Sequence, residues 1–288
     1  AAAGRRLGIP LVVSPRGMLQ PWAWRHHRWR KMLAWRLYQG RDLASAAAFC
    51  AASEAEAEAI RHCGFGQPIG IVPNGVAIPH LAPRHEPGHG EKTALFLSRI
   101  HPSKGPCLLV EAWSEAKPAG WNVVVAGPDE DGHRREVEQL VKERGLSEVF
   151  TFAGPVESEE KSRLLARSDL VILPTQSENF GLVVAEALAH AVPVITTTRA
   201  PWRGLREHEC GWWVEPDARD IAEAIRAATS MSDEERRAMG SRGRAWMTRS
   251  FSWAEAADRL LAFYQWILHG GGAPCCLFDG KGRGRDRG

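Results

Sequence analysis

The chain has 288 residues, of which 44% are hydrophobic and 25% are charged, and its formal net charge is +3. This is the composition of a globular protein, and so small a charge does not by itself indicate nucleic acid as a partner. No apolar run approaches the roughly 20 residues that a membrane-spanning helix needs. Six cysteines occur without a C-x-x-C pair. They indicate neither a zinc site nor a disulfide framework, and such scattered thiols fit a reducing cytoplasm.

Residues 1–72 alternate short apolar runs with helical patterns. "IPLVV" and "IGIVP" predict strands, and "SEAEAEAIRH" predicts a helix with Ser53 as its N-cap and Glu56 completing a capping box. The chain starts without an initiator methionine and enters a strand pattern almost at once. We therefore expect residues 1–72 to be the C-terminal part of a domain whose N-terminal part is missing.

A stretch rich in proline, glycine and histidine, residues 73–93, has no periodicity and is interpreted as an interdomain linker. Residues 94–251 then alternate apolar strands with helices, beginning with "TALFLSR". This alternation predicts βαβ units and a parallel sheet that is buried on both faces. A doubly wound domain of this kind binds its ligand at the carboxyl ends of the strands. We accordingly expect the site at residues 98–99, 126–128, 153–155 and 174–179.

The last part of the chain contains one further predicted helix, residues 252–268. The tail that follows, residues 269–288, is rich in glycine and arginine, and we expect it to be disordered.

Two glutamates lie in the otherwise apolar stretch "PTQSENFGLVVAEALA", residues 174–189. Glu178 precedes the predicted helix, and Glu186 lies inside it among small apolar residues. A buried carboxylate needs hydrogen-bond donors, which a ribose diol could supply. Gly181 allows close approach to the backbone at a helix N-terminus, where an anion or sugar hydroxyls bind well. The alternative is that Glu178 caps the helix and Glu186 faces water; the pair together with Gly181 favours a ligand site.

Two cations, Arg99 and Lys104, follow the first strand of this domain in "FLSRIHPSKG". Two positive charges at the carboxyl end of a strand suit a diphosphate. Taken alone they could equally be ordinary surface cations.

Four landmarks in order resemble family 4 (group 1) retaining glycosyltransferases: "VPNGV", "FLSRIHPSKG", the E-x7-E stretch "SENFGLVVAEALA" and the closing "FSWAEAADRLLAFYQWIL". The resemblance covers about residues 8–268. It implies a GT-B fold, with two Rossmann-like domains of which the N-terminal one is incomplete here. It also implies a donor domain at 94–251 and a C-terminal helix that crosses back to the N-terminal domain.

The resemblance also implies roles for particular residues. Glu186 would hold the ribose hydroxyls of a nucleoside-diphosphate sugar, and Glu178 would touch the donor sugar. Arg99 and Lys104 would bind the diphosphate, so that no metal or other cofactor is expected. By the same resemblance, the backbone amides of Asn179, Phe180 and Gly181 would contribute sugar or phosphate contacts, and Arg16 and Gly17 would lie near the donor sugar. Gly154, in "FAGPV", is expected to let the chain turn near the base; the alternative is a plain turn glycine.

Two departures from the family pattern concern these positions. Asn179 stands where relatives often have glycine, and asparagine tolerates the left-handed conformation better than most residues. Arg16 in "SPRGM" stands where many relatives have histidine before the glycine.

The resulting hypothesis is a cytoplasmic, metal-independent glycosyltransferase that retains the configuration of the donor sugar. Its acceptor would be a saccharide or a lipid-linked saccharide in bacterial cell-surface polysaccharide or glycolipid synthesis. Two alternatives stay open: a catalytically incomplete nucleotide-sugar-binding fragment, and a GT-B-fold epimerase acting on a nucleotide sugar.

The stretch "PWAWRHHRWRKMLAWRLYQGR", residues 21–41, has six Lys/Arg, four Trp and no acidic residue. Trp22, Trp29, Leu33 and Leu37 share one predicted helical stripe. The preferred interpretation is that this stripe packs on the N-terminal sheet while the cations face water. Peripheral association with an anionic membrane comes second, and nucleic acid is not expected because no recognised module is present.

Overall fold

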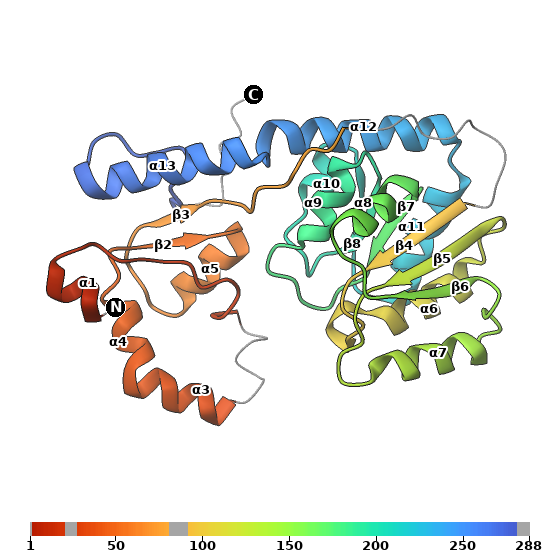
Figure 1. Ribbon diagram of the computed structural model, residues 1–288, viewed down its shortest axis with the longest axis horizontal. Coiled ribbons are helices and arrows are strands. Elements are labelled where there is room, and N and C mark those ends of the chain that lie inside the picture. Colours follow the sequence, from red (N-terminus) through yellow and green to blue (C-terminus); the bar gives the residue numbers. More distant parts are fainter. Residues whose placement is uncertain (1, 21–27, 81–91, 281–288) are drawn as a thin grey trace. The chain divides into compact units, whose positions relative to one another are not determined.

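The computed structural model describes residues 2–20, 28–80 and 92–280, and these form two compact units (Figure 1). Unit 1 comprises residues 1–75 and 253–288, and unit 2 comprises residues 76–252. The predicted boundary at residue 72 lies close to the first division, and the predicted start of the last helix at residue 252 lies close to the second. Most of the predicted linker, residues 81–91, falls outside the described residues.

Unit 1 is built on a parallel sheet of strand order β1-β2-β3 in the part of the chain described. Its elements are α1 (Ala2–Leu7), β1 (Val12–Val13), α3 (Arg28–Ala34), the π-helical turn η1 (Trp35–Gln39), α4 (Gly40–Ala44), β2 (Ala48–Ala51), α5 (Glu54–His62), β3 (Ile69–Ile71) and α13 (Trp253–His269).

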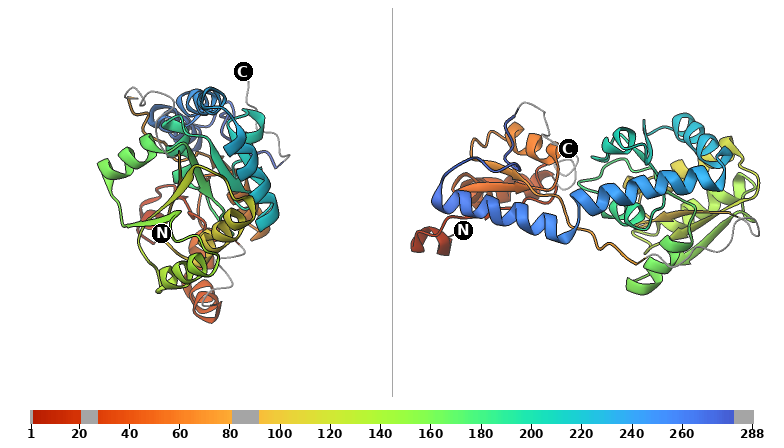
Figure 2. Two further views of the ribbon diagram at one scale, coloured as in Figure 1. Left: turned by 90° about the vertical axis from the view of Figure 1, so that its right-hand side faces the viewer. Right: turned by 90° about the horizontal axis from the view of Figure 1, so that it is seen from above.

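The two faces of this sheet are covered by different helices (Figure 2). Phe49 packs in one cluster with Ile60 of α5, whereas Ala48, the next residue before it, packs with Phe263 of α13. This alternation is the period of two that a strand imposes on its side chains. Gly70 of β3 makes room for α13, because a Cβ at that position would lie 2.8 Å from the Phe263 ring.

The central strand β2 was not predicted from the sequence. Its residues Ala48–Ala51 are all buried, but alanine has little preference for strands and the run has no polar alternation. β2 is recognised as a strand only in the folded chain, where it pairs with β1 on one side and β3 on the other.

The expectation that the tail is disordered is wrong for residues 269–280, since His269 ends α13 and the segment after it pairs with β3. The Ile71 N–H donates to the Cys276 carbonyl at 2.7 Å, and the Phe278 N–H donates to the Ile69 carbonyl at 2.8 Å. An antiparallel bridge joins Gly70 to Leu277, so this segment covers the open edge of β3. The residues that pair here form a short apolar run directly after a cluster of glycines. Because the tail as a whole is rich in glycine, its composition predicts disorder and hides this run. Residues 281–288 lie outside the described part of the chain.

The predicted packing of the Trp29 stripe on the sheet is also wrong. Trp29, Leu33 and Leu37 are 64%, 54% and 70% exposed. Trp35 packs on the core instead, with its ring centroid 5.9 Å from that of Phe65. Trp29, Leu33 and Leu37 therefore lie on the exposed side of α3 and η1, and the side that carries Trp35 faces the core. Both sides carry large apolar residues, so periodicity alone does not show which one is buried. Trp22 lies outside the described residues.

Unit 2 is a doubly wound α/β domain with the parallel strand order β6-β5-β4-β7-β8-β9 among the described residues. Its strands are β4 (Lys92–Leu97), β5 (Trp121–Ala126), β6 (Phe150–Gly154), β7 (Leu170–Leu173), β8 (Val194–Thr197) and β9 (Gly211–Val214). Its helices are η2 (Pro102–Lys104), α6 (Pro106–Ala116), α7 (His133–Glu143), α8 (Ser158–Arg167), α9 (Leu182–Ala189), α10 (Gly204–Glu207), α11 (Ala218–Ser230) and α12 (Asp233–Ser250).

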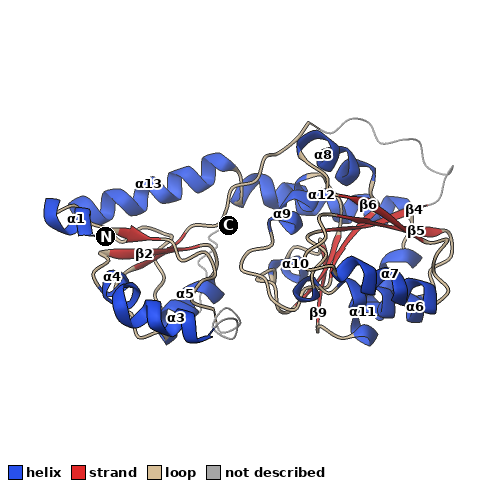
Figure 3. Cartoon of the chain, turned by 60° about the horizontal axis from the view of Figure 1, so that its bottom comes forward, coloured by secondary structure: helices blue, strands red, loops and turns tan. Residues whose placement is uncertain are grey.

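The helices of unit 2 lie on both faces of its sheet (Figure 3). α6, α7 and α11 cover one face, and α8, α9 and α12 cover the other. Each strand is therefore buried on both sides, as its near-continuous apolar sequence predicts. β4 and β7 are neighbours although two strands separate them in sequence. The direction of winding changes between them, and a ligand crevice opens at such a switch point, outside the carboxyl ends of the strands.

Removing residues 270–288 should destabilise unit 1 and expose the edge of β3. The loss of two backbone hydrogen bonds and of the buried Cys276 side chain predicts a fall of roughly 2–3 kcal/mol in the free energy of unfolding. Amide hydrogen exchange should also become faster at the Ile71 N–H. A chain ending at residue 280 is the matched control and should behave as the full chain does. Equal stability of the two truncated chains would contradict the assignment.

Candidate functional site

The loops that follow β4 and β7 are joined directly to each other. The Gln176 N–H donates to the Ser103 carbonyl at 2.8 Å, and the Thr175 hydroxyl donates to the same carbonyl at 2.9 Å. The Thr197 hydroxyl, at the end of β8, donates to the Thr175 carbonyl at 2.5 Å. Three strand ends are thus held together at the switch point.

Gly105 permits this contact at its closest point. Its φ is +72°, and a Cβ there would lie 2.0 Å from the Pro174 carbonyl oxygen. Any side chain would therefore force the two loops apart, in addition to the strain of a left-handed conformation. Pro106 follows as the first residue of α6, a position where its missing N–H has no helical partner to lose.

Lys104 and Glu178 form an ion pair across the two loops. The Lys104 ammonium lies 2.6 Å from Glu178 Oε2, and the two side chains are only 11% and 15% exposed. Glu178 Oε1 also accepts the N–H of Asn179 at 3.2 Å. A lysine ammonium has three N–H donors, so this pair fixes the position of the ammonium and leaves donors for a further anion.

Arg99 is not brought to this pair. Its guanidinium contacts both carboxylate oxygens of Glu130, at 2.7 and 2.5 Å, and it is 54% exposed. Of the two cations that the sequence grouped together, the structure joins Lys104 to Glu178 and Arg99 to Glu130.

The Asn179–Gly181 turn presents backbone N–H groups at the start of α9. Phe180 is buried against Trp202, with ring centroids 5.2 Å apart, and the Trp202 indole N–H donates to the Phe180 carbonyl. This bond fixes the orientation of the Phe180 carbonyl. The N–H groups of Phe180 and Gly181 have no acceptor among the described residues. They are suited to bind a phosphate or sugar oxygen. The positive φ in this turn belongs to Gly181, at +80°, and not to Asn179.

Glu186 lies one turn inside α9 and is paired with a lysine of α8. The Lys161 ammonium lies 2.6 Å from Glu186 Oε1, and the glutamate side chain is 16% exposed. The next residue, Ser162, bonds to His190 Nε2 at 2.9 Å, while His190 Nδ1 lies 2.8 Å from the Glu186 carbonyl. Burial lowers the pKa of His190 below its ordinary value. The ring is therefore neutral at pH 7, with Nδ1–H donating to the carbonyl and Nε2 accepting from the hydroxyl.

Three other residues were expected to contact the donor: Gly154, Arg16 and Gly17. Gly154 ends β6 with a φ of +79°, and no atom lies within 4 Å of a Cβ there, so its backbone conformation and not packing explains the glycine. Arg16 and Gly17 belong to unit 1. Arg16 has a φ of +53° and donates to the Asn74 side chain.

Glu56 supports the Arg16–Gly17 turn, a role that the sequence did not reveal. It is 1% exposed and accepts the Gly17 N–H at 2.5 Å and the Ala52 N–H at 2.7 Å. The Ser53 hydroxyl accepts the Glu56 N–H, as the predicted N-cap requires. The glutamate carboxylate is thus directed to the backbone of a distant loop and to Ala52, just ahead of its own helix.

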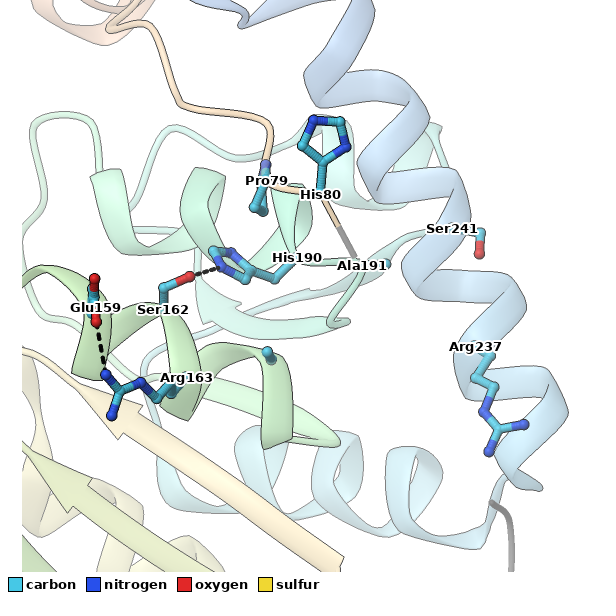
Figure 4. Close-up of a pocket in the computed structure, with 10 residues that line it drawn as sticks. Pro79, His80, Glu159, Ser162, Arg163, His190, Ala191, Arg237 and Ser241 are labelled. Carbon is cyan, nitrogen blue, oxygen red and sulfur yellow. Dashed lines mark hydrogen bonds and ion pairs between the residues drawn. The ribbon is translucent and has the colours of Figure 1, made fainter. Parts of the chain in front are cut away.

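A cavity of about 470 Å³ lies at the other end of α9 from Glu178 (Figure 4). It is lined by residues of α8 and α12, by the Pro79–His80 segment and by His190 and Ala191. In Figure 4, Arg163 is engaged by Glu159 and His190 by Ser162. None of the predicted site residues lines this cavity, and its polar side chains do not converge on one point.

A row of three side chains, Cys107, His133 and Glu136, has the order of a nucleophile, a base and an acid. Cys107 Sγ lies 3.8 Å from His133 Nε2, and His133 Nδ1 lies 2.8 Å from Glu136. Burial, with Glu136 and Glu111 adding to it, raises the pKa of the Cys107 thiol to about 11. The nucleophilic thiolate is therefore almost absent at pH 7, and the row does not support a cysteine hydrolase.

The triplet Asp129-Glu130-Asp131 has the Asp-x-Asp pattern that can hold a divalent cation. Asp129 accepts the N–H of Arg134 at 2.9 Å, and Glu130 is paired with Arg99. No group of three or more His, Cys, Asp or Glu side chains that could hold a metal ion is found in the described ranges.

Family profiles match most of the chain. The profile described as "Glycosyl transferases group 1" matches residues 79–246, and "Glycosyltransferase Family 4" matches residues 1–78. The chain belongs to the group 1 glycosyl transferases. This confirms the family inferred from the E-x7-E stretch and its neighbouring landmarks.

Curated relatives and solved structures agree with this membership. D-inositol 3-phosphate glycosyltransferase from Nocardia farcinica is 34% identical over 245 residues, which cover 75% of this chain and 51% of that protein. The chain spans about half the length of the curated relatives it matches.

Among solved structures, Anabaena HepE in complex with UDP and glucose matches with a TM-score of 0.74 at 19% identity, over 91% of this chain and 73% of that one. Sucrose-phosphate synthase from Thermosynechococcus elongatus matches with a TM-score of 0.72 at 22% identity, over 94% and 76%. These similarities confirm the predicted fold class, a mixed α/β chain of GT-B type with parallel sheets.

Proposed function

We propose that this chain carries the donor site of a retaining glycosyltransferase. It would move a sugar from a nucleoside-diphosphate sugar to a hydroxyl acceptor, in the synthesis of a bacterial cell-surface polysaccharide or glycolipid. The observation that carries the proposal is the ion pair of Lys104 and Glu178, largely buried at the switch point between β4 and β7. A cation fixed there suits a diphosphate, and the carboxylate beside it suits sugar hydroxyls.

The proposed mechanism assigns one task to each group. The Lys104 ammonium offsets the negative charge that grows on the diphosphate as the bond to the sugar breaks. The N–H groups of Phe180 and Gly181 bind phosphate or sugar oxygens, and Glu178 orients the donor sugar. The departing phosphate oxygen takes the proton of the acceptor hydroxyl on the same face of the sugar, so the configuration is retained. No step in this scheme needs a metal ion.

The similar proteins support the substrate class. HepE is described in complex with UDP, with glucose and with UDP-glucose. The curated relatives are named for D-inositol 3-phosphate, which carries hydroxyl groups. UDP is therefore the first nucleotide to test, with D-inositol 3-phosphate and simple glycosides as the first acceptors. Transfer distinguishes this proposal from a nucleotide-sugar-binding fragment, which would bind without turnover, and from an epimerase, which would change the donor without an acceptor.

Nucleotide should stabilise unit 2 through Glu186. Ligand at 100 times its dissociation constant adds about 2.7 kcal/mol to the free energy of unfolding. For a unit of this size that should raise the unfolding midpoint by roughly 5–10 °C. UDP, GDP and ADP should be compared by thermal unfolding of the wild type and of Glu186→Ala, in which the shift should be lost.

Lys142→Met is the control for this experiment, since Lys142 is an exposed lysine of α7 outside the proposed site. It should keep the full shift. The donor-site proposal fails if no nucleotide moves the wild-type midpoint, or if Glu186→Ala responds as the wild type does.

We also propose that unit 1 associates peripherally with an anionic membrane, which would place the enzyme at the cytoplasmic face. Large apolar side chains crowd the outer side of α3 and η1: Trp29, Met32, Leu33, Leu37 and Tyr38 are 45–70% exposed. Residues 28–41 carry five Lys/Arg and no acidic residue, and each cation near an anionic surface contributes about 1 kcal/mol. Among the described residues no helix is long and apolar enough to cross a bilayer.

The double variant Leu33→Glu/Leu37→Glu should reduce binding to vesicles of mixed phosphatidylglycerol and phosphatidylcholine about tenfold, because it removes apolar contact and adds negative charge. Co-sedimentation measures the bound fraction. Leu261→Glu, at another exposed leucine of unit 1, is the matched control and should bind as the wild type does. Equal binding to pure phosphatidylcholine, or an equal loss in the control, would exclude this surface.

A further inference from the structure

Lys161 is the one described residue that donates a hydrogen bond to the Glu186 carboxylate. It reaches Glu186 from α8, at 2.6 Å from Oε1, and is 33% exposed. The other oxygen, Oε2, has no hydrogen-bond donor among the described residues. The carboxylate is therefore held from one side and open on the other.

The surroundings of Glu186 make this single partner important. Its neighbours in α9, Val184, Ala185, Ala187 and Leu188, are all buried, so the helix sets the glutamate at the edge of an apolar layer. A carboxylate that is 16% exposed loses most of its hydration and needs a counter-charge. Lys161 supplies that charge and also limits the rotamers that the glutamate can adopt.

α8 contacts α9 through two polar side chains. Leu165 is its buried residue, and its polar contacts to α9 come from two adjacent positions. Lys161 bonds to the Glu186 side chain, and Ser162 bonds to His190. The two contacts can be removed separately, which allows the effect on Glu186 to be distinguished from a general loosening of α8.

We propose that Lys161 is a positioning residue for the ribose of the donor nucleotide. It holds the Glu186 carboxylate as an oriented anion whose Oε2 accepts the ribose hydroxyls. This inference rests on the proposed donor site and extends it to a residue that lies in none of the matched sequence landmarks. Lys161 acts through Glu186, so its contribution depends on the presence of ribose hydroxyls in the ligand.

The test compares two ligands by isothermal titration calorimetry: the nucleoside diphosphate that binds the wild type, with UDP first, and its 2′,3′-dideoxy analogue. Lys161→Met should weaken binding of the hydroxylated nucleotide about tenfold, the value of one hydrogen bond to a charged group. Binding of the dideoxy analogue should be the same in the wild type and the variant. Lys161→Arg, which keeps the charge, should restore most of the affinity for the hydroxylated nucleotide.

Two further variants guard against a merely structural explanation. In the Glu186→Gln background, Lys161→Met should cause no further loss. Ser162→Ala, which removes the neighbouring contact to α9, should leave the difference between the two ligands unchanged. The inference is overturned if Lys161→Met weakens both ligands equally, or weakens neither. If the wild type binds UDP, GDP and ADP no better than a non-nucleotide control, the donor-site proposal itself fails; this is a separate outcome, and the inference fails with it.

Discussion

Two lysine–glutamate pairs, whose glutamate side chains are only 15% and 16% exposed, are the constraint on which the rest of unit 2 depends. Lys104 and Glu178 close the gap between the loops after β4 and β7, and Lys161 and Glu186 connect α8 to α9. Removing the lysine of either pair leaves a glutamate without its counter-charge and with little access to water. Each pair therefore fixes side chains that could otherwise turn toward solvent, and it does so at the strand ends where a doubly wound sheet binds its ligand.

The scaffold around these pairs is built to keep the loops close. Gly105 removes the side chain that would collide with the Pro174 carbonyl, and the Ser103 carbonyl receives two hydrogen bonds from the opposite loop. Behind the Phe180–Gly181 turn, Trp202 packs against Trp246 and Phe251, with ring centroids 5.6 and 5.4 Å apart. This aromatic cluster, together with the indole N–H, holds the Phe180 carbonyl and leaves the adjacent N–H groups free for a ligand.

The architecture of unit 2 could be predicted because its strands are apolar runs separated by clear helical patterns. The same rule fails for β2, whose alanines carry no strand signal, and for the segment around Leu277, which follows several glycines. Glu178 and Glu186 could be singled out because carboxylates are unusual in an apolar stretch. Their lysine partners could not be predicted in the same way. Lys104 was expected to act beside Arg99, and Lys161 lies in a charged helix whose sequence pattern does not single out any one residue as an ion-pair partner. Partners across elements follow from tertiary packing, which periodicity does not report.

Glu56 shows the same limit in unit 1. Local sequence predicts a helix cap, and the Ser53 hydroxyl does accept the Glu56 N–H. The carboxylate also accepts the N–H of Gly17, 39 positions earlier in the chain. Nothing in a local window connects these residues. The strained turn at Arg16 is a feature that only the folded chain explains.

The central claim is that Lys104 stabilises the departing diphosphate. The most direct test compares Lys104→Ala with the wild type in two assays: nucleotide affinity by calorimetry, and the turnover rate with whichever sugar nucleotide the wild type uses. Loss of a group that acts mainly in the transition state should lower the rate about 100-fold or more, while the dissociation constant rises by less than about tenfold. An unchanged rate, or a loss confined to affinity, would contradict the assignment of Lys104.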